Sequence, residues 1–332
     1  MTVSRVINQS PGVRDETRGR VDAAIRELGY APNVAARHLA SAGLIRLAML
    51  YAKPHAYIAE FLFGGLDQAR MHHAQFIIEK CENIRKARAE IDRIVSEGAD
   101  GLLIAPPIGD SERVLDHLEN SDVPVVVVTS SPIRPSVSAV RIDGYAAARE
   151  MTQHIVSLGH RKIGFIVGDP KHASSDHRLR GYRDALAETG IAVNDEWIAQ
   201  GLFTYRSGLD AAEQLLGLDD RPTAIFASND DMAAAAVAVA HRRDLDVPAD
   251  LTICGFDDTP LATEMWPQLT TIRVPTAELT RTATDLLMEK IRARQRGETL
   301  PPEHRVLDYR LIRRQSDAAP RLRPRATVGL SK

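Results

Sequence analysis

Residues 1–43 read MTVSRVINQSPGVRDETRGRVDAAIRELGYAPNVAARHLASAG, and this stretch decides the fold of the N-terminal part of the chain. Val3, Val6 and Ile7 stand at i, i+3 and i+4, which is the spacing of one apolar helical face. Ser10-Pro11-Gly12 ends that helix. A second amphipathic helix follows, and its apolar stripe consists of Val21, Ala24, Ile25 and Leu28. The pattern predicts a small unit of packed helices.

The opposite face of the first helix is polar and carries Thr2, Ser4, Arg5 and Asn8. In a major groove an arginine can donate to guanine O6 and N7, while hydroxyl groups hold phosphates. An arginine taken alone is more often a solvated surface residue. The small hydrogen-bonding neighbours of Arg5 favour a nucleic-acid groove instead.

A third helical segment spans residues 33–40, after Pro32. Its eight residues are fewer than the roughly 12–15 that an isolated helix needs, so we expect it to fold only when something holds it. Leu39 is an apolar residue beside Arg37 and His38, a combination typical of a wedge that enters a minor groove between base steps. The alternative is that Leu39 packs on its own domain.

The runs TVSRVIN (2–8) and ETRGRVDAAIRELGYAPNVAAR (16–37) resemble the DNA-binding headpiece and hinge of the lactose-repressor (LacI/GalR-type) family of bacterial transcription factors. The resemblance implies that Arg5 contacts a base from the recognition helix and that Leu39 of the hinge helix intercalates. The residues it assigns to double-stranded operator DNA are Thr2, Ser4, Arg5, Asn8, Asn33, Ala36, Arg37 and Leu39.

The first helix of the headpiece is missing from this pattern, because the chain begins at the recognition helix. A helix-turn-helix needs both of its helices. Either the start codon lies upstream of Met1, or the protein is a sensor with impaired DNA binding. We favour the upstream start, because a degenerate headpiece is expected to lose its groove-facing residues, and these are present.

The composition is typical of a soluble protein with a large core. The 332 residues allow two or three domains, 44% of them are hydrophobic, and a net charge of −2 argues against a protein that coats polyanions over its whole surface. Cys81 and Cys254 stand alone, which favours buried thiols over a disulfide or zinc site. The sequence has neither a run of about 18 apolar residues nor a signal peptide. We therefore expect a cytoplasmic protein with no cofactor and no metal.

From Leu44 onward, short apolar runs alternate with amphipathic helical stretches. Such runs are typical of parallel strands that are buried on both faces. The runs are IRLAML (45–50), QFIIE (75–79), DGLLIA (100–105), VPVVVV (123–128), KIGFIVG (162–168), TAIFAS (223–228) and LTICGF (251–256). The helical stretches cover residues 59–71, 87–97, 180–190, 231–242 and 277–294. This order predicts an α/β protein with two doubly wound lobes of parallel sheet.

The chain passes between the lobes more than once in this prediction. It crosses near Arg141-Ile142-Asp143, and the run LTTIRVP (269–275) returns it to the first lobe. The expected divisions are a partial helix-turn-helix headpiece with its hinge at 1–43, a first lobe at 44–143 plus 274–303, and a second lobe at 144–273 plus 304–315. The tail, 316–332, is rich in Pro, Arg and Ala, and we expect it to be disordered.

Two such lobes leave a cleft at the carboxyl ends of their strands, where open α/β sheets bind ligands. The runs LGHRKIGFI, RLRGY, FASNDDMA, GFDDTPLA and LTTIR resemble the sensor of the same family, which has a periplasmic-binding-protein-like fold. The resemblance implies that Arg178, Asn229 and Asp257 hold the effector. Polar or aromatic residues at strand ends and nearby complete the candidate effector site, which is Tyr51, Tyr57, Thr129, Arg178, Asn229, Asp257 and Trp266.

Each of the three central residues has a structural alternative. Asp257 could cap the turn after its strand, Asn229 could be the N-cap of its helix, and Arg178 could pair with Asp176 or Asp184. Three neighbouring carboxylates are expected to be caps or solvated charges rather than ligands; they are Asp230, Asp231 and Asp258.

An enzyme is the least favoured function class. The sequence has no GxSxG elbow, HExxH, Walker loop or strand-linked GxGxxG, and the adjacent Asp257-Asp258 cannot flank a scissile bond. The leading hypothesis is a homodimeric transcriptional regulator, a repressor, whose operator affinity is controlled by a small effector between the lobes. A sugar or glycoside is the favoured effector, and a purine or nucleoside is its competitor. The alternative is a stand-alone solute-binding protein of the same two-lobe fold.

Overall fold

The computed structural model describes residues 44–52, 58–81, 84–129 and 134–321, together with Val6, Arg14, Thr17, Gly19–Val21, Ala23 and Ala24. The chain divides into two compact units, residues 1–45 and 46–332. In the first unit Val6 is helical and buried, as the apolar face of the first helix predicts. Ala24 is helical but exposed, contrary to the predicted stripe, and its single methyl group gains little from burial. All eight predicted DNA-contacting residues lie outside the described residues.

The first lobe of the second unit is built on a six-stranded parallel sheet with the order β11-β5-β4-β3-β1-β2. Its strands are β1 (Arg46–Tyr51), β2 (Gln75–Lys80), β3 (Gly101–Ile104), β4 (Val125–Thr129), β5 (Ser138–Arg141) and β11 (His304–Val306). The four apolar runs predicted for this lobe are four of these strands. The inner strands β1, β3 and β4 are mostly apolar and buried because helices cover both faces of the sheet, whereas the edge strand β2 carries Gln75, Glu79 and Lys80 and is partly exposed.

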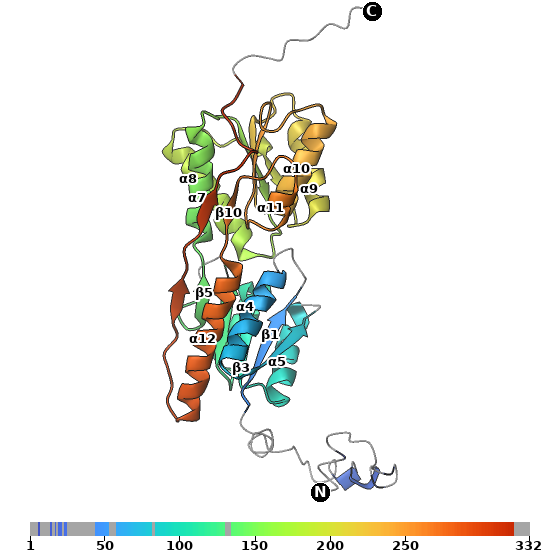
Figure 1. Cartoon of the computed structure of the whole chain (residues 1–332), viewed down its shortest axis with the longest axis vertical. Helices are drawn as coiled ribbons and strands as arrows, with labels where there is room; N and C mark the ends of the chain where they lie inside the picture. The colour runs from blue at the N-terminus through green and yellow to red at the C-terminus, as the bar shows by residue number, and fades with distance from the viewer. Residues whose placement is uncertain are drawn as a thin grey trace, which may run out of the picture. The chain divides into compact units, whose positions relative to one another are not determined.

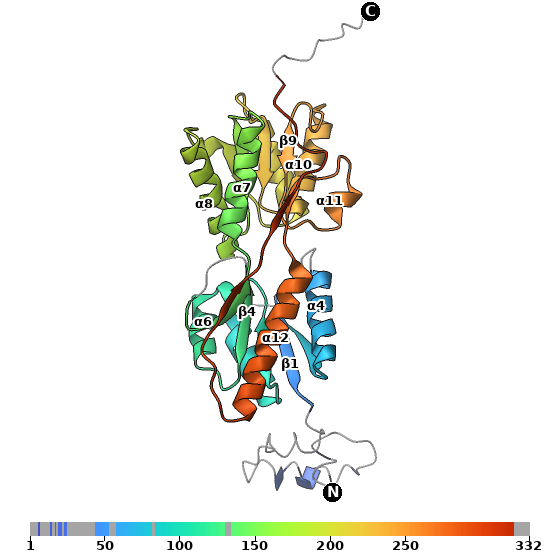
Figure 2. The same cartoon turned by 60° about the vertical axis from the view of Figure 1, so that its left-hand side comes forward.

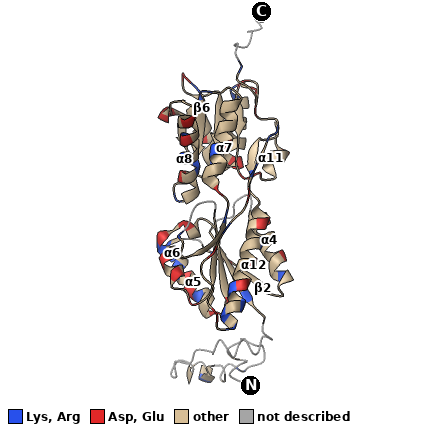
Figure 3. Ribbon diagram, turned by 90° about the vertical axis from the view of Figure 1, so that its left-hand side faces the viewer, with Lys and Arg blue, Asp and Glu red and all other residues tan. Residues whose placement is uncertain are grey.

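Helices α5 (Ala87–Ser96) and α6 (Glu112–Glu119) cover one face of this sheet, where Ile91 and Leu115 pack against strand residues such as Leu50. Helices α4 (Ile58–Met71) and α12 (Thr276–Gln295) pack side by side over the other face (Figure 1, Figure 2). Short 3-10 turns at Ile84–Lys86 and Ile108–Asp110 precede α5 and α6. Charged residues are concentrated on the helices, while the strands of the sheet are mostly uncharged (Figure 3).

The second lobe has a four-stranded parallel sheet with the order β7-β6-β8-β9. The strands are β6 (Ile163–Val167), β7 (Ile198–Gln200), β8 (Ala224–Ala227) and β9 (Thr252–Cys254). The helices are α7 (Gly144–Ser157), α8 (Ala173–Glu188), α9 (Tyr205–Leu216), α10 (Asp230–Arg242) and α11 (Leu261–Glu264), with a 3-10 turn at Asp195–Trp197. The three predicted runs are strands here. Strand β7 was not predicted, because three residues at a sheet edge are too short to show a period.

Three segments connect the lobes. The chain leaves the first lobe after β5, and β10 (Thr271–Arg273) leads into α12, which packs on the first sheet as predicted. The third connection lies between β11 and β12 (Arg310–Ile312), which pairs antiparallel with β10. Residues 304–306 therefore belong to the first lobe, and their assignment to the second lobe is wrong. The physical reason is that β5 had an open edge, and β11 pairs with it in parallel.

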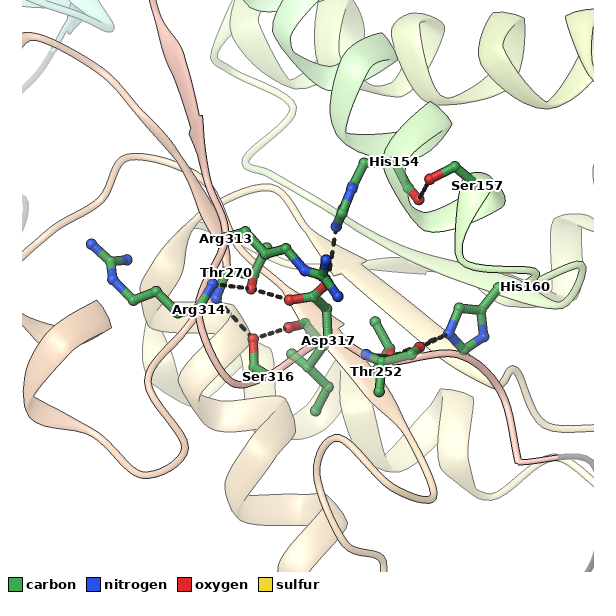
Figure 4. Close-up of polar contacts among 11 residues, drawn as sticks. His154, Ser157, His160, Thr252, Thr270, Arg313, Arg314, Ser316 and Asp317 are labelled. Atoms are coloured by element: carbon green, nitrogen blue, oxygen red, sulfur yellow. Dashed lines mark hydrogen bonds and ion pairs between the residues drawn. The ribbon is translucent and has the colours of Figure 1, made fainter.

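The segment after β12 is tied into the second lobe (Figure 4). The Asp317 side chain is fully buried and accepts hydrogen bonds from Thr270, His154 Nε2 at 2.9 Å and Arg313 Nε at 3.0 Å. Ile253 N donates to the Ser316 carbonyl at 2.9 Å, which extends the edge of β9. The prediction of a disordered tail is therefore wrong for residues 316–321, because polar partners rather than apolar packing hold them. Residues 322–332 lie outside the described residues.

Within the described parts of the chain, no helix combines the length and the apolar character needed to cross a lipid bilayer.

Candidate functional site

A cavity of about 70 Å³ lies between the lobes, at the carboxyl ends of the strands. Thr129 is the last residue of β4, and Asp257 follows β9 after two residues. Both lobes supply the lining, as is usual for a ligand site at the switch point of open α/β sheets. The lining residues are Phe61, Pro106, Val128, Thr129, His172, Ser174, Arg178, Phe203, Asn229, Asp231, Asp257, Val274, Thr276 and Leu279.

Arg178 lies in the second turn of α8 and is almost completely buried. Its guanidinium donates to the Ser228 carbonyl and stacks on the Phe256 ring, with Cζ 3.6 Å from the ring centroid. Its Nη2 lies 3.7 Å from Asp257 Oδ1. The alternative pairings with Asp176 and Asp184 are not formed, because those carboxylates bind other partners: Asp176 pairs with Arg180, and Asp184 accepts from Tyr145.

Asn229 has two roles, and the sequence allowed both. It is the N-cap of α10, where its Oδ1 accepts a hydrogen bond from Met232 N at 3.1 Å. Its Nδ2 donates to the Phe203 carbonyl at 3.2 Å. These two bonds hold the amide in one orientation at the wall of the cavity, and one amide proton and one oxygen lone pair are left for other partners.

Asp257 is held in a rare backbone conformation, with φ at +109°. Its N–H donates to the Ile272 carbonyl at 2.8 Å, so a neighbouring inter-lobe segment holds the strained residue in place. Burial raises the pKa of Asp257 to about 7, the positive charge of Arg178 limits this rise, and Asp231 adds to it. A carboxyl group whose pKa lies near 7 is present in both protonation states at physiological pH, so it can accept or donate a hydrogen bond.

The neighbouring carboxylates separate into two groups. Asp230 is buried away from the cavity, accepts from Thr259 N at 2.7 Å and Thr271 Oγ1 at 2.6 Å, and thereby joins α10 to the loop at Thr259 and to strand β10. Asp258 pairs with Arg273 and Arg314. Neither residue is part of the cavity lining, but the prediction that they are caps or solvated charges is wrong, because both side chains are buried against polar partners.

Asp231 is the residue that sequence reasoning missed. It was expected to be a cap or a solvated charge, but it lines the cavity, and burial raises its pKa. His172 and Phe203 also line the cavity without having been predicted, and their rings meet edge to face at 5.3 Å between centroids. One signal was available for Asp231, since the residues after an N-cap at a strand end lie in the first turn of a helix that points at the cleft.

Thr129 lines the cavity and also takes part in a contact between the lobes. Its Oγ1 donates to Asp110 Oδ1 at 3.4 Å, and Asp110 Oδ2 accepts from Ala173 N at 3.3 Å. Ala173 is the first residue of α8, so a first-lobe carboxylate caps a second-lobe helix. Burial raises the pKa of Asp110 to about 6.

Two further predicted effector residues, both within the described part of the chain, are not brought to this cavity. Trp266 is 75% exposed and is not part of the lining. Tyr51 is half-buried at the end of β1 and is not part of the lining either. Tyr57 lies outside the described residues. Of the six predicted side chains that the structure describes, the cavity contains four, Thr129, Arg178, Asn229 and Asp257. Among the described residues, no group of three or more His, Cys, Asp or Glu side chains is arranged to hold a metal ion.

Comparisons with known proteins agree with this architecture. Residues 1–33 match the family model for bacterial regulatory proteins of the lacI family, and residues 152–316 match the model for a periplasmic binding protein-like domain. The chain is 35% identical to catabolite control protein A of Priestia megaterium over 321 residues, which are 95% of this chain and 94% of that protein.

Two solved structures extend the comparison. The complex of the transcriptional regulator CelR with cellobiose is similar with a TM-score of 0.75 and 29% identity, over 94% of each chain. The lac repressor dimer bound to operator and the anti-inducer ONPF has a TM-score of 0.75 and 26% identity, over 96% of this chain and 95% of that one. Family models, relatives and structures therefore agree that this chain belongs to the lacI family of bacterial regulatory proteins and is a DNA-binding transcriptional regulator.

Proposed function

We propose that this regulator binds a small hydroxylated effector, a sugar or a glycoside, in the cavity between its lobes, and that the effector controls its affinity for operator DNA. The observation that carries the proposal is the meeting of Arg178, Asn229 and Asp257 at one cavity that also has an apolar wall. A guanidinium, an amide and a carboxylate suit vicinal hydroxyls, and an apolar wall suits the C–H face of a pyranose. Similarity to a regulator solved with cellobiose supports a saccharide, and a purine or nucleoside is the competing class.

A ligand screen followed by calorimetry tests this proposal. Thermal-shift screening of mono- and oligosaccharides, nucleobases and nucleosides identifies a ligand, whose affinity is then measured for wild type and for Arg178→Ala, Asn229→Ala and Asp257→Ala. We expect at least about tenfold weaker binding in each variant, because each loses a hydrogen-bonding partner of the ligand. Three folded variants that bind within about twofold of wild type would place the effector elsewhere. The same ligands, incubated with the protein and recovered unchanged, support a regulator that performs no catalysis.

The N-terminal unit is proposed to read operator DNA through the residues assigned to it above, with Arg5 specifying a guanine and Leu39 kinking the operator centre. Arg5→Ala should cost about 1–3 kcal/mol on operator DNA and little on random DNA. Equal losses on both DNAs would make Arg5 a phosphate contact only.

Leu39→Ala should weaken operator binding and leave effector binding unchanged. An unaltered operator affinity in this variant would show that Leu39 does not act as a wedge in the minor groove.

We further propose that the protein acts in the cytoplasm as a homodimer, because one headpiece reads only a half-site. An exposed apolar face is available on the first lobe. Strand β2 lies at the edge of its sheet, and Ile78 on β2 is exposed together with Phe63 and Met71 on the adjacent helix α4. An open strand edge beside exposed apolar side chains suits pairing with a second copy of the chain.

Sedimentation of wild type and Phe63→Glu tests this face. The expected result is a dimer for wild type and a monomer that still binds the effector for the variant. Trp266→Glu, at an exposed aromatic side chain of the second lobe, is the matched control and should remain dimeric. A Phe63→Glu protein that stays dimeric at micromolar concentration would place the interface elsewhere.

A further inference from the structure

Acidic side chains outnumber basic side chains in the described lining of the cavity. Among its described lining residues, Asp231 and Asp257 are carboxylates and Arg178 is a guanidinium, with His172 as a further titratable side chain. Asp231 contributes to the raised pKa of Asp257, so the two carboxylates are close enough to interact electrostatically. A ligand in this cavity therefore meets two acidic groups and one basic group from the described part of the lining.

Arg178 is also already engaged. Its guanidinium donates to the Ser228 carbonyl, stacks on Phe256 and lies 3.7 Å from Asp257. An anionic ligand group that reached Arg178 would have to share it with the Asp257 carboxylate. Such a group would also lose its hydration in a cavity whose other wall is apolar, which is costly for a charge without a partner.

A neutral hydroxyl group of a ligand is favoured in this cavity, in contrast to an anionic group. It donates to a carboxylate, so each of the two acidic side chains can accept a hydrogen bond from it. The apolar side of the cavity then receives the C–H face of the same molecule. The lining contains both kinds of surface. The apolar side chains are Phe61, Pro106, Val128, Phe203, Val274 and Leu279.

We propose that this cavity selects effectors without an anionic group, and that Asp231 is the specificity-determining residue that excludes the phosphorylated form of an otherwise acceptable ligand. The inference rests on the proposed function of the cavity as the effector site. Asp231 is suited to this role because it lines the cavity from the first turn of α10 and is not a cap of that helix. Its carboxylate is therefore available to repel an anion without being required for the fold.

Calorimetry on the full chain with matched pairs of probes tests the inference. The pairs are glucose and glucose 6-phosphate, fructose and fructose 6-phosphate, and adenosine and adenosine monophosphate. For the scaffold that binds, we expect the neutral member to bind wild type at least about tenfold more tightly than its phosphate. Asp231→Asn should reduce that ratio at least about threefold, mainly through better binding of the phosphate. Asp210→Asn removes an exposed carboxylate of the same lobe and should leave the ratio within about twofold.

The outcomes separate the inference from the proposed function. If a phosphate binds as tightly as its neutral partner and Asp257→Ala abolishes its binding, the cavity is the effector site and the exclusion of anions is wrong. If Asp231→Asn leaves the ratio unchanged, Asp231 is not the selecting residue. If a probe binds and Asp257→Ala leaves its affinity unaltered, the cavity is not the effector site, and the inference fails together with the proposed function.

Discussion

The two lobes meet the same cavity with different chemistry. The second lobe contributes hydrogen-bonding and charged groups, Arg178, Asn229, Asp231 and Asp257, whereas the first lobe contributes mainly apolar side chains such as Phe61, Val128 and Leu279. Directional polar contacts select a ligand, while apolar contacts are less directional and depend on how closely the wall approaches it. The difference indicates that the second lobe recognises the effector and the first lobe closes on it.

The largest effect is expected from substitutions of the polar side chains that the second lobe contributes to the cavity. Asp257→Ala and Arg178→Ala should each weaken effector binding about ten- to a hundredfold, since losing a charged partner of a buried ligand hydroxyl costs about 1.5–3 kcal/mol. If the effector is an inducer, operator binding should persist at effector concentrations that release the wild type. Arg180→Ala, two residues along α8 and exposed, is the control. Equal losses in Arg180→Ala would show that damage to α8 explains the effect.

The second prediction concerns pH. Burial raises the pKa of Asp230 to about 8 from an ordinary value of 3.8, so the folded protein retains a proton that the unfolded chain releases. The free energy of unfolding should therefore decrease as pH rises from about 4 to about 8, by up to about 1.4 kcal/mol per pH unit for this group. Asp257, with a pKa of about 7, acts in the same direction over a narrower range.

Thermal melts of the effector-free protein at a series of pH values measure this dependence. Asp230→Asn stays neutral and can still accept from Thr259, so its melting temperature should vary less between pH 5 and pH 8 than that of wild type. Asp210→Asn, which changes an exposed side chain of the same lobe, should follow the wild-type profile. A profile that is equally steep in Asp230→Asn and wild type contradicts the assignment of this dependence to Asp230.

A smaller effect is expected from the apolar side. Val128→Ala removes two methyl groups from the first-lobe wall, which corresponds to about 1–2 kcal/mol of lost apolar contact and an affinity loss of roughly five- to thirtyfold. The loss should be similar for all ligands that bind, whereas loss of a polar group should change which ligands bind. Calorimetry with two ligands of different hydroxyl pattern distinguishes the two cases. If Val128→Ala changes which ligand binds more tightly, the proposal that the second lobe recognises the effector and the first lobe only closes on it is contradicted.

The smallest effect concerns the contact between the lobes. Asp110→Ala removes the acceptor that Ala173 N and Thr129 Oγ1 share. A single hydrogen bond contributes about 0.5–1.5 kcal/mol, so apparent effector affinity should fall about two- to tenfold while ligand preference stays the same. Small-angle scattering should show a larger radius of gyration for the effector-free variant than for wild type. Identical scattering and identical affinity would mean that this bond does not influence closure.

The sequence anticipated the parts of the site that lie at the ends of strong apolar runs. Arg178, Asn229 and Asp257 were recognised from motifs, and the structure places them together with Thr129 at the carboxyl ends of the strands. Trp266 was chosen for its chemistry alone, and it lies on the surface in the segment that follows the short helix α11. Asp231 was assigned to a cap or to solvent, although its place in the first turn of α10, directly after a strand end and an N-cap, was a signal that it faces the cleft.

The sequence by itself determined the class of fold, because strands covered on both faces must be apolar along their whole length and the helices between them must be amphipathic. It also determined which side chains follow those strands, since position along the chain sets that order. Only the tertiary structure decided that residues 304–306 join the first sheet and that residues 316–321 belong to the second lobe. Edge pairing and buried polar contacts involve partners far apart in the chain, such as β11 with β5 and Asp317 with His154. The free energy of such pairing and of such contacts depends on the positions of both partners in the folded protein, which the local sequence around either partner does not determine.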